Sequence, residues 1–405
     1  MQSFTLKMKN ALGSIGPGFI TASLVLGPGS ITTASKAGAD FGYRLIWLLL
    51  LSASFMMLYT TMSTRFGVIS KKSLLTVIAE NYGRWLSVLI GVSCFMITAA
   101  FEFGNNLGVA TAMNSLTNTP EFIWPIIFTL FALVVMITAS DLYKLLERIM
   151  MGLVLLMILA FCTNLIFAKP NFIAASRGLV PWIPAASLPV ASGMVATTFS
   201  IAACFYQSYL VQEKGWTLTS CKRGIRDSIS GISVLGLISL IIILTSAAAL
   251  NPKRIRIATA ADMAIQLEAL FGITAKYIFS LGLWAAAFSS FIINAILGGN
   301  LLSDGLGLGR GIGNPYSKGF AAAILLIGML IAVFFKGNIV HALVLAQAST
   351  LVAVPACVIT LFLISNNKNI MGNSRNSIWQ NIWAILGMLL LLGLSYRTFM
   401  RLFFE

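Results

Sequence analysis

The chain has 405 residues, of which 58% are hydrophobic and only 10% are charged. Average soluble domains carry roughly 25% charged residues, so the composition excludes a soluble globular protein and predicts an all-α integral membrane protein in a lipid bilayer. The net charge of +15 does not indicate nucleic-acid binding, because the basic residues are scattered between apolar runs and form no patch interleaved with aromatic residues. An excess of Lys and Arg on cytoplasmic loops accounts for it.

Eleven apolar runs are long enough to cross a bilayer as helices. They lie near residues 12–38, 43–66, 86–115, 122–140, 149–168, 187–212, 229–250, 275–303, 319–335, 339–365 and 378–397. The loops between them are short, so we expect one transmembrane domain over residues 1–405. Lys and Arg are more frequent on the loops that share a side with the N-terminus. This bias predicts a multi-pass inner (plasma) membrane protein with a cytoplasmic N-terminus and an external C-terminus.

The first run is interrupted by the sequence Gly27-Pro28-Gly29-Ser30. Proline lacks an amide hydrogen and glycine favours open dihedral angles, so a helix must break here. Within a bilayer, a break is tolerated only where protein or a water-filled cavity satisfies the freed backbone groups. Broken helices of this kind mark the substrate site in many secondary transporters. We therefore expect Gly27 to Ser30 to face a binding cavity near the middle of the membrane.

Charged residues inside the spans and on the longest outer loop are few. Glu102 is the one carboxylate well inside a predicted span, and such a group is a functional candidate by default. It can act as a proton carrier or as a fixed partner for a basic group such as Arg84. On the outer loop 251–275, Asp262 and Glu268 follow an amphipathic pattern that predicts a surface helix.

The sequence offers no pattern for enzyme chemistry or for a metal cluster. The five Cys residues form no CxxC pair, and the single His, His341, stands at the start of a predicted span, where we interpret it as an interfacial side chain. The glycine-rich segment 305–313 follows a span rather than a strand, so the dinucleotide-binding fingerprint lacks its context and we expect a flexible inner loop. We find no nucleophile–base pair or cofactor motif, and predict neither an enzyme nor a cofactor.

Several motifs resemble those of the Nramp divalent-metal transporters. They are Gly16-Pro17-Gly18-Phe19, Gly27-Pro28-Gly29-Ser30, residues 37–43, residues 65–68, residues 143–147, Gly193-Met194, residues 210–212, Ser289-Ser290, and Gln347 with Pro355. Because the similarity covers nearly the whole chain at consistent spacing, the chain is identified as a member of this superfamily. The resemblance implies a LeuT-type fold of 11 transmembrane helices. Helices 1–5 and 6–10 would form a 5+5 inverted repeat (approximately 12–168 and 187–365), followed by an extra helix at 378–397, and helices 1 and 6 would be broken at the midplane.

The chain departs from the family at the metal site. Helix 1 of the metal transporters carries Asp-Pro-Gly-Asn, whereas Gly27 and Ser30 occupy the Asp and Asn positions here. The Met-Pro-His of helix 6 falls on Ser200, Ile201 and Ala202. The soft thioether, the helix-breaking proline and the proton-linked His are therefore all absent.

The resemblance also locates the family's proton route and one retained position. A second His of helix 6 falls on Gln207, and an Asp and a Glu of helix 3 fall on Glu102 and Asn105. The Gln347 position, which helps to bind metal from helix 10 in the family, is kept.

The site that remains carries no charge and no metal ligand of the usual kind. The candidate substrate-binding residues are Gly27, Gly29, Ser30, Thr197, Thr198, Ser200 and Gln347. Transition metals prefer anionic or soft ligands, and Mg²⁺ usually takes at least one carboxylate. A helix N-terminus beyond Gly29 instead favours negative charge by about 0.3–1 kcal/mol, and the hydroxyl groups add donors. The hydroxyls of Thr197 and Thr198 serve equally well as contacts between packed helices.

Two coupling ions are candidates, Na⁺ and H⁺. In sodium-coupled carriers of the LeuT type, a Ser/Thr pair on helix 8 joins carbonyl groups of helix 1 around Na⁺, and Ser289 and Ser290 occupy that place by fold analogy. Metal-transporting Nramp proteins have the same pair, so it does not discriminate between the two ions. Glu102 is the candidate for H⁺.

Three functions follow from these observations. The favoured one is a secondary active transporter that works by alternating access on a small anionic or polar solute such as bicarbonate or a carboxylate, as a symporter with Na⁺ as the candidate ion. The second is a divalent cation (Mg²⁺ or Mn²⁺) transporter with an altered, hydrated site. The third is a non-transporting membrane sensor, similar to the Nramp-like domains of plant ethylene signalling. The sequence leaves open the oligomeric state and whether helix 6, without its proline, is unwound.

Overall fold

The protein is helical throughout the residues that the computed structural model describes, which are 21, 25–138, 140–311 and 313–404. The Gly16–Phe19 motif lies outside these residues. Within them, eight helices are long and apolar enough to cross a membrane, and two shorter apolar helices, Ile123–Met136 and Val154–Ala168, accompany them. The expected all-α membrane architecture is confirmed.

Each predicted run coincides with one helix or with a broken pair, although the first run is described only in part. These elements are α3 (Pro28–Phe41), α4 (Ile46–Ile69), α6 (Arg84–Thr117), α7 (Ile123–Thr138), α8 (Ser140–Ala168), α10 (Leu188–Thr198) with α11 (Ile201–Glu213), α12 (Cys221–Ala249), α15 (Ala275–Gly305), α16 (Pro315–Phe334), α17 (Ile339–Ser349) with α18 (Val354–Asn366), and α20 (Ile378–Phe403). The boundaries agree with the runs to within a few residues in most cases, because bilayer thickness sets a minimum length for each helix.

Short helices lie in the connections between the long ones. They are α5 (Leu74–Tyr82), α9 (Phe172–Arg177), α13 (Ala260–Ala264), α14 (Glu268–Phe271) and α19 (Lys368–Met371). The single surface helix expected in the loop 251–275 is instead two short ones, α13 and α14, separated by a 3₁₀ turn. Asp262 closes a capping box with Thr259 at the start of α13, so its role there is to satisfy helix amides.

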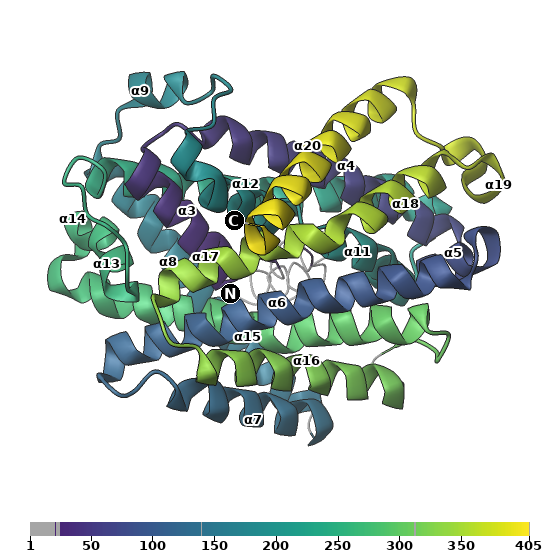
Figure 1. The fold of residues 1–405 in the computed structure, drawn as a ribbon, viewed down its shortest axis with the longest axis horizontal. Helices are drawn as coiled ribbons and strands as arrows, with labels where there is room; N and C mark the ends of the chain where they lie inside the picture. The colour runs from purple at the N-terminus through teal and green to yellow at the C-terminus, as the bar shows by residue number, and fades with distance from the viewer. Residues whose placement is uncertain (1–20, 22–24, 139, 312, 405) are drawn as a thin grey trace, which may run out of the picture.

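The long helices pack in layers around α3, α10 and α17. In Figure 1, α6, α15, α16 and α7 run nearly parallel through the lower half of the molecule, and α20 crosses over α4 and packs against α18. Helix α3 lies against α12 at Gly38, where a Cβ atom would come within 2.6 Å of the Ile243 carbonyl oxygen. Only glycine permits this approach, as is common where membrane helices meet. The contact fixes α3, whose first turn faces the interior.

Candidate functional site: a small cavity between two helix breaks

Helix α3 begins at the Gly-Pro-Gly break that the sequence indicates. Gly27 is its N-cap residue with extended dihedral angles (φ −100°, ψ −175°), and Pro28 occupies the first helical position, where its missing amide hydrogen costs nothing. No side chain caps the first turn. The break therefore leaves the start of α3 facing the protein interior.

Helix 6 is broken even though it lacks proline and glycine at this point. Helix α10 ends at Thr198 and α11 starts at Ile201, with Phe199 (φ −106°, ψ 66°) and Ser200 (φ −76°, ψ 103°) outside helical geometry. The Phe199 ring is buried, with its centroid 5.0 Å from that of Tyr59 on α4. We attribute the break to this anchored ring, together with the weak helix propensity of the Thr-Thr-Phe-Ser run.

The two breaks enclose a small cavity. Its lining comes from five places: the start of α3, α6, the α10–α11 break, α15 and α17. The lining side chains used below are Ser30, Asn105, Thr197, Ser200, Asn294 and Gln347, with Gly27 and Gly29 contributing backbone. The cavity volume is about 20 Å³, which is enough for about one water molecule.

Six of the seven predicted substrate-binding residues lie on this cavity, and Thr198 is not among its lining residues. Thr198 is the last residue of α10 and follows Thr197 directly, so the two side chains point in different directions on the helix. Being buried, the Thr198 side chain fits the alternative of helix packing better than the cavity.

Two of the three hydroxyl groups on the cavity, those of Ser30 and Thr197, donate to backbone carbonyl groups. Ser30 donates to the Gly27 carbonyl oxygen at 2.9 Å, and Thr197 donates to the carbonyl oxygens of Gly193 (2.9 Å) and Met194 (3.1 Å). What these hydroxyls offer to a ligand is therefore oxygen lone pairs. Thr197, one of the hydroxyl groups expected to donate to an anion, therefore has its proton engaged by the backbone in this geometry.

Two amide oxygens on the cavity have no hydrogen-bond partner among the described residues. They are Oε1 of Gln347 and Oδ1 of Asn294, and both side chains are buried. Gln347 is held between two glycines, since a Cβ atom on Gly29 or on Gly104 would come within 2.4 Å of its amide group. Each of these amide groups carries an unpaired oxygen acceptor and also N–H donors, so both side chains are polar groups beside the cavity.

Glu102 does not line the cavity itself, and the side chain of Asn105 lies between them. Its side chain is fully buried on α6, its Oε2 accepts a hydrogen bond from Asn105 Nδ2 at 3.2 Å, and its Oε1 has no partner among the described residues. Asn105 itself lines the cavity, and its Oδ1 lies 3.5 Å from where a Cβ atom on Gly27 would stand. Asn105 thus connects the carboxyl group to the break in helix 1. The ion pair with Arg84 that the sequence allowed is not formed.

The two serines of α15 differ in their positions. Ser290 is buried, and its Oγ lies 3.2 Å from the position of a Cβ atom on Gly27, so it faces the break. Ser289 is only half-buried and is not among the nearest neighbours of Gly27. Both hydroxyls donate to the Ala286 carbonyl oxygen. Only one of the predicted pair is therefore placed against helix 1.

Asn294 and Asn105 were not among the predicted substrate-binding residues. Asn294 is an amide in an otherwise apolar stretch and stands four residues after Ser290, on the same face of α15. That spacing is a signal that sequence reasoning could have used. Asn105 was recognised through the family's proton route, but its place on the cavity follows only from how α6 packs against α3.

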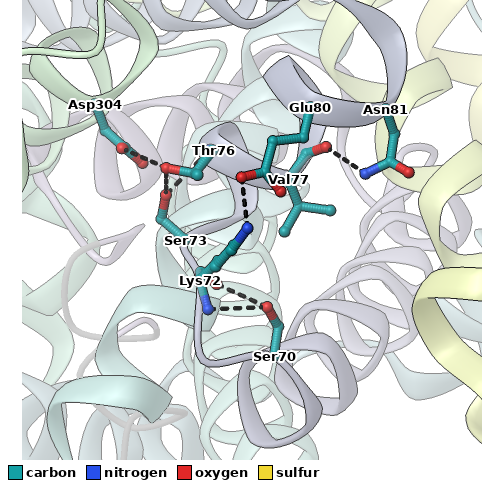
Figure 2. A network of polar contacts seen from close by, with 8 residues as sticks. All are labelled: Ser70, Lys72, Ser73, Thr76, Val77, Glu80, Asn81 and Asp304. Atoms are coloured by element: carbon teal, nitrogen blue, oxygen red, sulfur yellow. Dashed lines mark hydrogen bonds and ion pairs between the residues drawn. The ribbon is translucent and has the colours of Figure 1, made fainter.

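A polar network lies at the far ends of α11 and α15. Asp304, near the end of α15, is buried and accepts hydrogen bonds from Thr76 of α5 (3.2 Å) and from the Tyr209 hydroxyl of α11. Ser73 caps α5 and donates to the Thr76 hydroxyl at 2.7 Å (Figure 2). Tyr209 is nine residues after Ser200, so this network lies about 13 Å along α11 from the cavity. It joins three helices on one side of the site.

No group of three or more His, Cys, Asp or Glu side chains that could hold a metal ion occurs among the described residues. A cation in the cavity would instead meet neutral oxygen atoms, which are ligands that Mg²⁺, Ca²⁺ and Mn²⁺ accept.

Comparisons with known proteins agree over nearly the whole chain. The family model described as natural resistance-associated macrophage protein-like (Nramp) matches residues 18–401. The divalent metal cation transporter MntH of Klebsiella pneumoniae (strain 342) is 25% identical over 394 residues, covering 96% of this chain and 94% of that protein. The MntH of Bacillus subtilis (strain 168) is also 25% identical, over 403 residues, covering 96% of this chain and 92% of its own length.

Solved structures show the same fold. A mutant of the Eremococcus coleocola manganese transporter superposes with a TM-score of 0.79 at 17% identity, covering 98% of this chain and 89% of that one. The nucleobase-cation-symport-1 family transporter Mhp1, in a closed conformation with bromovinylhydantoin bound, gives a TM-score of 0.58 at 12% identity, covering 95% of this chain and 93% of that one. The expected LeuT-type fold is confirmed.

Proposed function

The chain belongs to the Nramp family of membrane transporters, and from this premise we propose that its substrate is a divalent metal cation carried by alternating access. The family membership makes it a multi-pass transporter rather than an enzyme. Relatives that match over almost their full length are named divalent metal cation transporters, which supports a cation as the substrate class. We place it in the inner membrane with a cytoplasmic N-terminus, following the bias of its basic loops.

One observation carries the proposal: the cavity has room for a ligand no larger than a single ion or water molecule, and oxygen atoms with free lone pairs lie on its walls. A space of about 20 Å³ suits one monoatomic ion or one water. Bicarbonate, with four heavy atoms, exceeds it. Ser30 and Thr197 present lone pairs because backbone carbonyl groups take up their protons, and the lining residues Gln347 and Asn294 each have an amide oxygen without a partner among the described residues. Metal cations bind such atoms and anions do not.

Glu102, which lies behind the residues that line the cavity, partly compensates for the carboxylate that is missing at position 27. Glu102 is linked to the cavity through Asn105, and when ionised it would lower the energy of a cation in this low-dielectric interior. A buried carboxylate in turn needs a positive charge to remain ionised. Cation entry would therefore favour release of the Glu102 proton, and we propose H⁺ rather than Na⁺ as the coupling ion.

The anionic substrate that the sequence motifs favour is not supported by these comparisons. The relatives are named divalent metal cation transporters, and the hydroxyl protons of Ser30 and Thr197 are taken up by backbone carbonyl groups. One observation speaks for an anion: α3 opens onto the cavity with no side-chain cap, and a helix N-terminus favours negative charge. We rank this second, because the effect is about 0.3–1 kcal/mol at an exposed helix end and is opposed by the acceptor atoms on the other walls.

Uptake into proteoliposomes tests the proposal. Purified protein is reconstituted, and entry of Mn²⁺, Mg²⁺, bicarbonate and acetate is measured with ion-selective dyes and radiolabel against empty liposomes. We expect saturable entry of one or both cations, with no entry of the anions. Entry of bicarbonate or acetate alone would reverse the substrate assignment. Absence of all four fluxes, with a correctly folded protein, would favour the sensor hypothesis.

A further inference from the structure

A second cavity opens where α3 ends and α17 begins, and we call it the vestibule. Its volume is about 710 Å³, which lies within the range of small-molecule sites, about 300–1,000 Å³. Three segments form its walls: the last turns of α3, the loop that follows α12, and the start of α17. The polar residues used below are Lys36, Asp40, Asn251, Arg254, Arg256 and His341.

The charged groups in the vestibule are unbalanced. Lys36 and Asp40 neutralise each other through an ion pair of 2.8 Å along α3. Arg254 and Arg256 remain, and neither guanidinium group has a hydrogen bond or an ion pair within the part of the chain that the structure describes. The vestibule therefore carries two uncompensated positive charges, with the His341 ring exposed beside them as a further donor.

The two arginines are held on an ordered loop. Arg254 adopts a left-handed conformation (φ 53°), its amide donates to the Asn251 carbonyl oxygen at 3.0 Å, and the Asn251 side chain donates to the Ala39 carbonyl oxygen of α3 at 2.8 Å. Ile257 is buried in the core, so alternation along the extended segment leaves Arg256 on the exposed side. The backbone that carries both arginines is therefore held in place against α3, which leaves their unpaired side chains at one fixed part of the vestibule.

From this arrangement we propose that the vestibule binds a small soluble oxyanion carrying two or more negative charges, such as inorganic phosphate or a di- or tricarboxylate. The planar fork of Arg matches carboxylate and phosphate oxygens, and two forks at one cavity favour a ligand with several such oxygens. The concave shape favours a dissolved molecule over a lipid headgroup, which would approach from the bilayer surface.

The site is distinct from the central cavity but shares two helices with it. Lys36 is six residues after Ser30 on α3, and His341 is six residues before Gln347 on α17, so about 9 Å of helix separates the two cavities. Anion binding is measured without any metal, so this inference stands or falls independently of the proposed function.

Isothermal titration calorimetry on the purified full-length protein in detergent tests the proposal, with inorganic phosphate and citrate as probes at constant ionic strength. We expect saturable binding of at least one probe, weakened about tenfold or more in Arg254→Gln/Arg256→Gln. The matched control is Arg397→Gln/Arg401→Gln, which removes the same charge from exposed positions of α20 and should leave binding unchanged. Equal weakening in both double variants would reduce the effect to net charge and overturn the proposal.

Two further arms complete the test. Vesicles containing phosphatidylglycerol are offered in place of the soluble probes, and binding of vesicles alone would assign the arginines to lipid instead. Thermal unfolding of both double variants checks that they fold. If Arg254→Gln/Arg256→Gln unfolds, Arg254→Lys/Arg256→Lys replaces it. We then expect a reduced but measurable affinity for the anion, because Lys keeps the positive charge but lacks the planar fork of Arg. Absence of binding by the folded wild-type protein would refute the site.

Discussion

The Glu102 carboxyl group and the Asn105 side-chain amide are joined by a hydrogen bond of 3.2 Å, and Asn105 lines the central cavity whereas Glu102 does not. Among the described residues, the buried Glu102 carboxyl group is thus linked to the cavity through a neutral side chain. A cation in the cavity would be sensed at Glu102 as an electrostatic effect in a low-dielectric medium, without direct coordination.

This relationship predicts that Glu102→Gln separates binding from proton coupling. The variant cannot release a proton when a cation binds, so the proton released by the wild-type protein, up to about one per site, should disappear. Proton release is followed with a pH indicator during titration with Mn²⁺ in weakly buffered solution. Glu268→Gln, at an exposed position on α14, is the control and should behave as wild type. Undiminished proton release by Glu102→Gln would contradict the assignment.

A second prediction concerns the contact of Gly104 with Gln347. A Cβ atom at position 104 would stand 2.4 Å from Gln347 Nε2, so Gly104→Ala must push that amide group toward a cavity of only about 20 Å³. We expect cation uptake to fall about tenfold or more, because small displacements of positioned groups are costly. Gly393→Ala, which meets no atom within 4 Å on α20, should leave uptake unchanged and stabilise the helix by up to about 1 kcal/mol.

A double variant tests whether displacement of the Gln347 side chain causes the loss of uptake in Gly104→Ala. If Gly104→Ala acts by displacing the Gln347 side chain, it should cause no further loss in a Gln347→Ala background, where that side chain is absent. Additive losses in the double variant would mean that the alanine disturbs α6 itself.

Filling the cavity should abolish transport without unfolding the protein. A leucine side chain at Ser30 or Ser200 exceeds the available volume, so uptake by Ser30→Leu and Ser200→Leu should be undetectable while their size-exclusion profiles match the wild type. Ser54→Leu, at a half-buried position of α4 where the hydroxyl bonds only to its own helix, controls for the added bulk. Normal uptake in both cavity variants would remove these serines from the site.

The network around Asp304 predicts an effect on stability. In Tyr209→Phe the buried carboxyl group loses one of its two side-chain hydroxyl donors, which should cost about 1–3 kcal/mol. We expect a lower melting temperature and faster hydrogen exchange in α5, the helix that Thr76 ties to Asp304. Tyr396→Phe, with a side chain 64% exposed on α20, should change neither. If hydrogen exchange in α5 is equally fast in Tyr209→Phe and Tyr396→Phe, the hydrogen bonds to Asp304 do not stabilise the packing of α5.

Much of the fold was predictable from hydropathy, because a bilayer imposes a minimum length on every spanning helix. The break at Gly27 was predictable for a local reason, since glycine and proline disfavour helix regardless of their surroundings. The break at Phe199 was expected only from the family resemblance, because the local sequence has neither proline nor glycine there and the Phe199 ring packs against Tyr59 of a distant helix. Likewise, no sequence pattern says that the Ser30 hydroxyl donates to the Gly27 carbonyl oxygen and so leaves the cavity rich in acceptors.

The sharpest test of the substrate class is Gly27→Asp, which restores the carboxylate found in the family's helix 1 motif. The dihedral angles at Gly27 are accessible to any residue, and the new Cβ atom would meet the flexible Ser290 hydroxyl at 3.2 Å, so only a small adjustment is needed. Asp is also a better N-cap than Gly by a few tenths of a kcal/mol. The substitution therefore adds negative charge to the cavity at little structural cost.

For a cation substrate, Gly27→Asp should tighten Mn²⁺ binding about tenfold or more, since an anionic oxygen joins the neutral ones. The control is Gly27→Asn, which has nearly the same shape and also caps α3 but carries no charge. Both variants are compared with wild type by calorimetry and by proteoliposome uptake. If Gly27→Asp instead abolishes uptake of bicarbonate or acetate, and Gly27→Asn does not, the cavity carries anions and the charge has repelled them. If the two variants behave alike toward every ion, the ligand does not approach the break in helix 1, and the site must lie elsewhere.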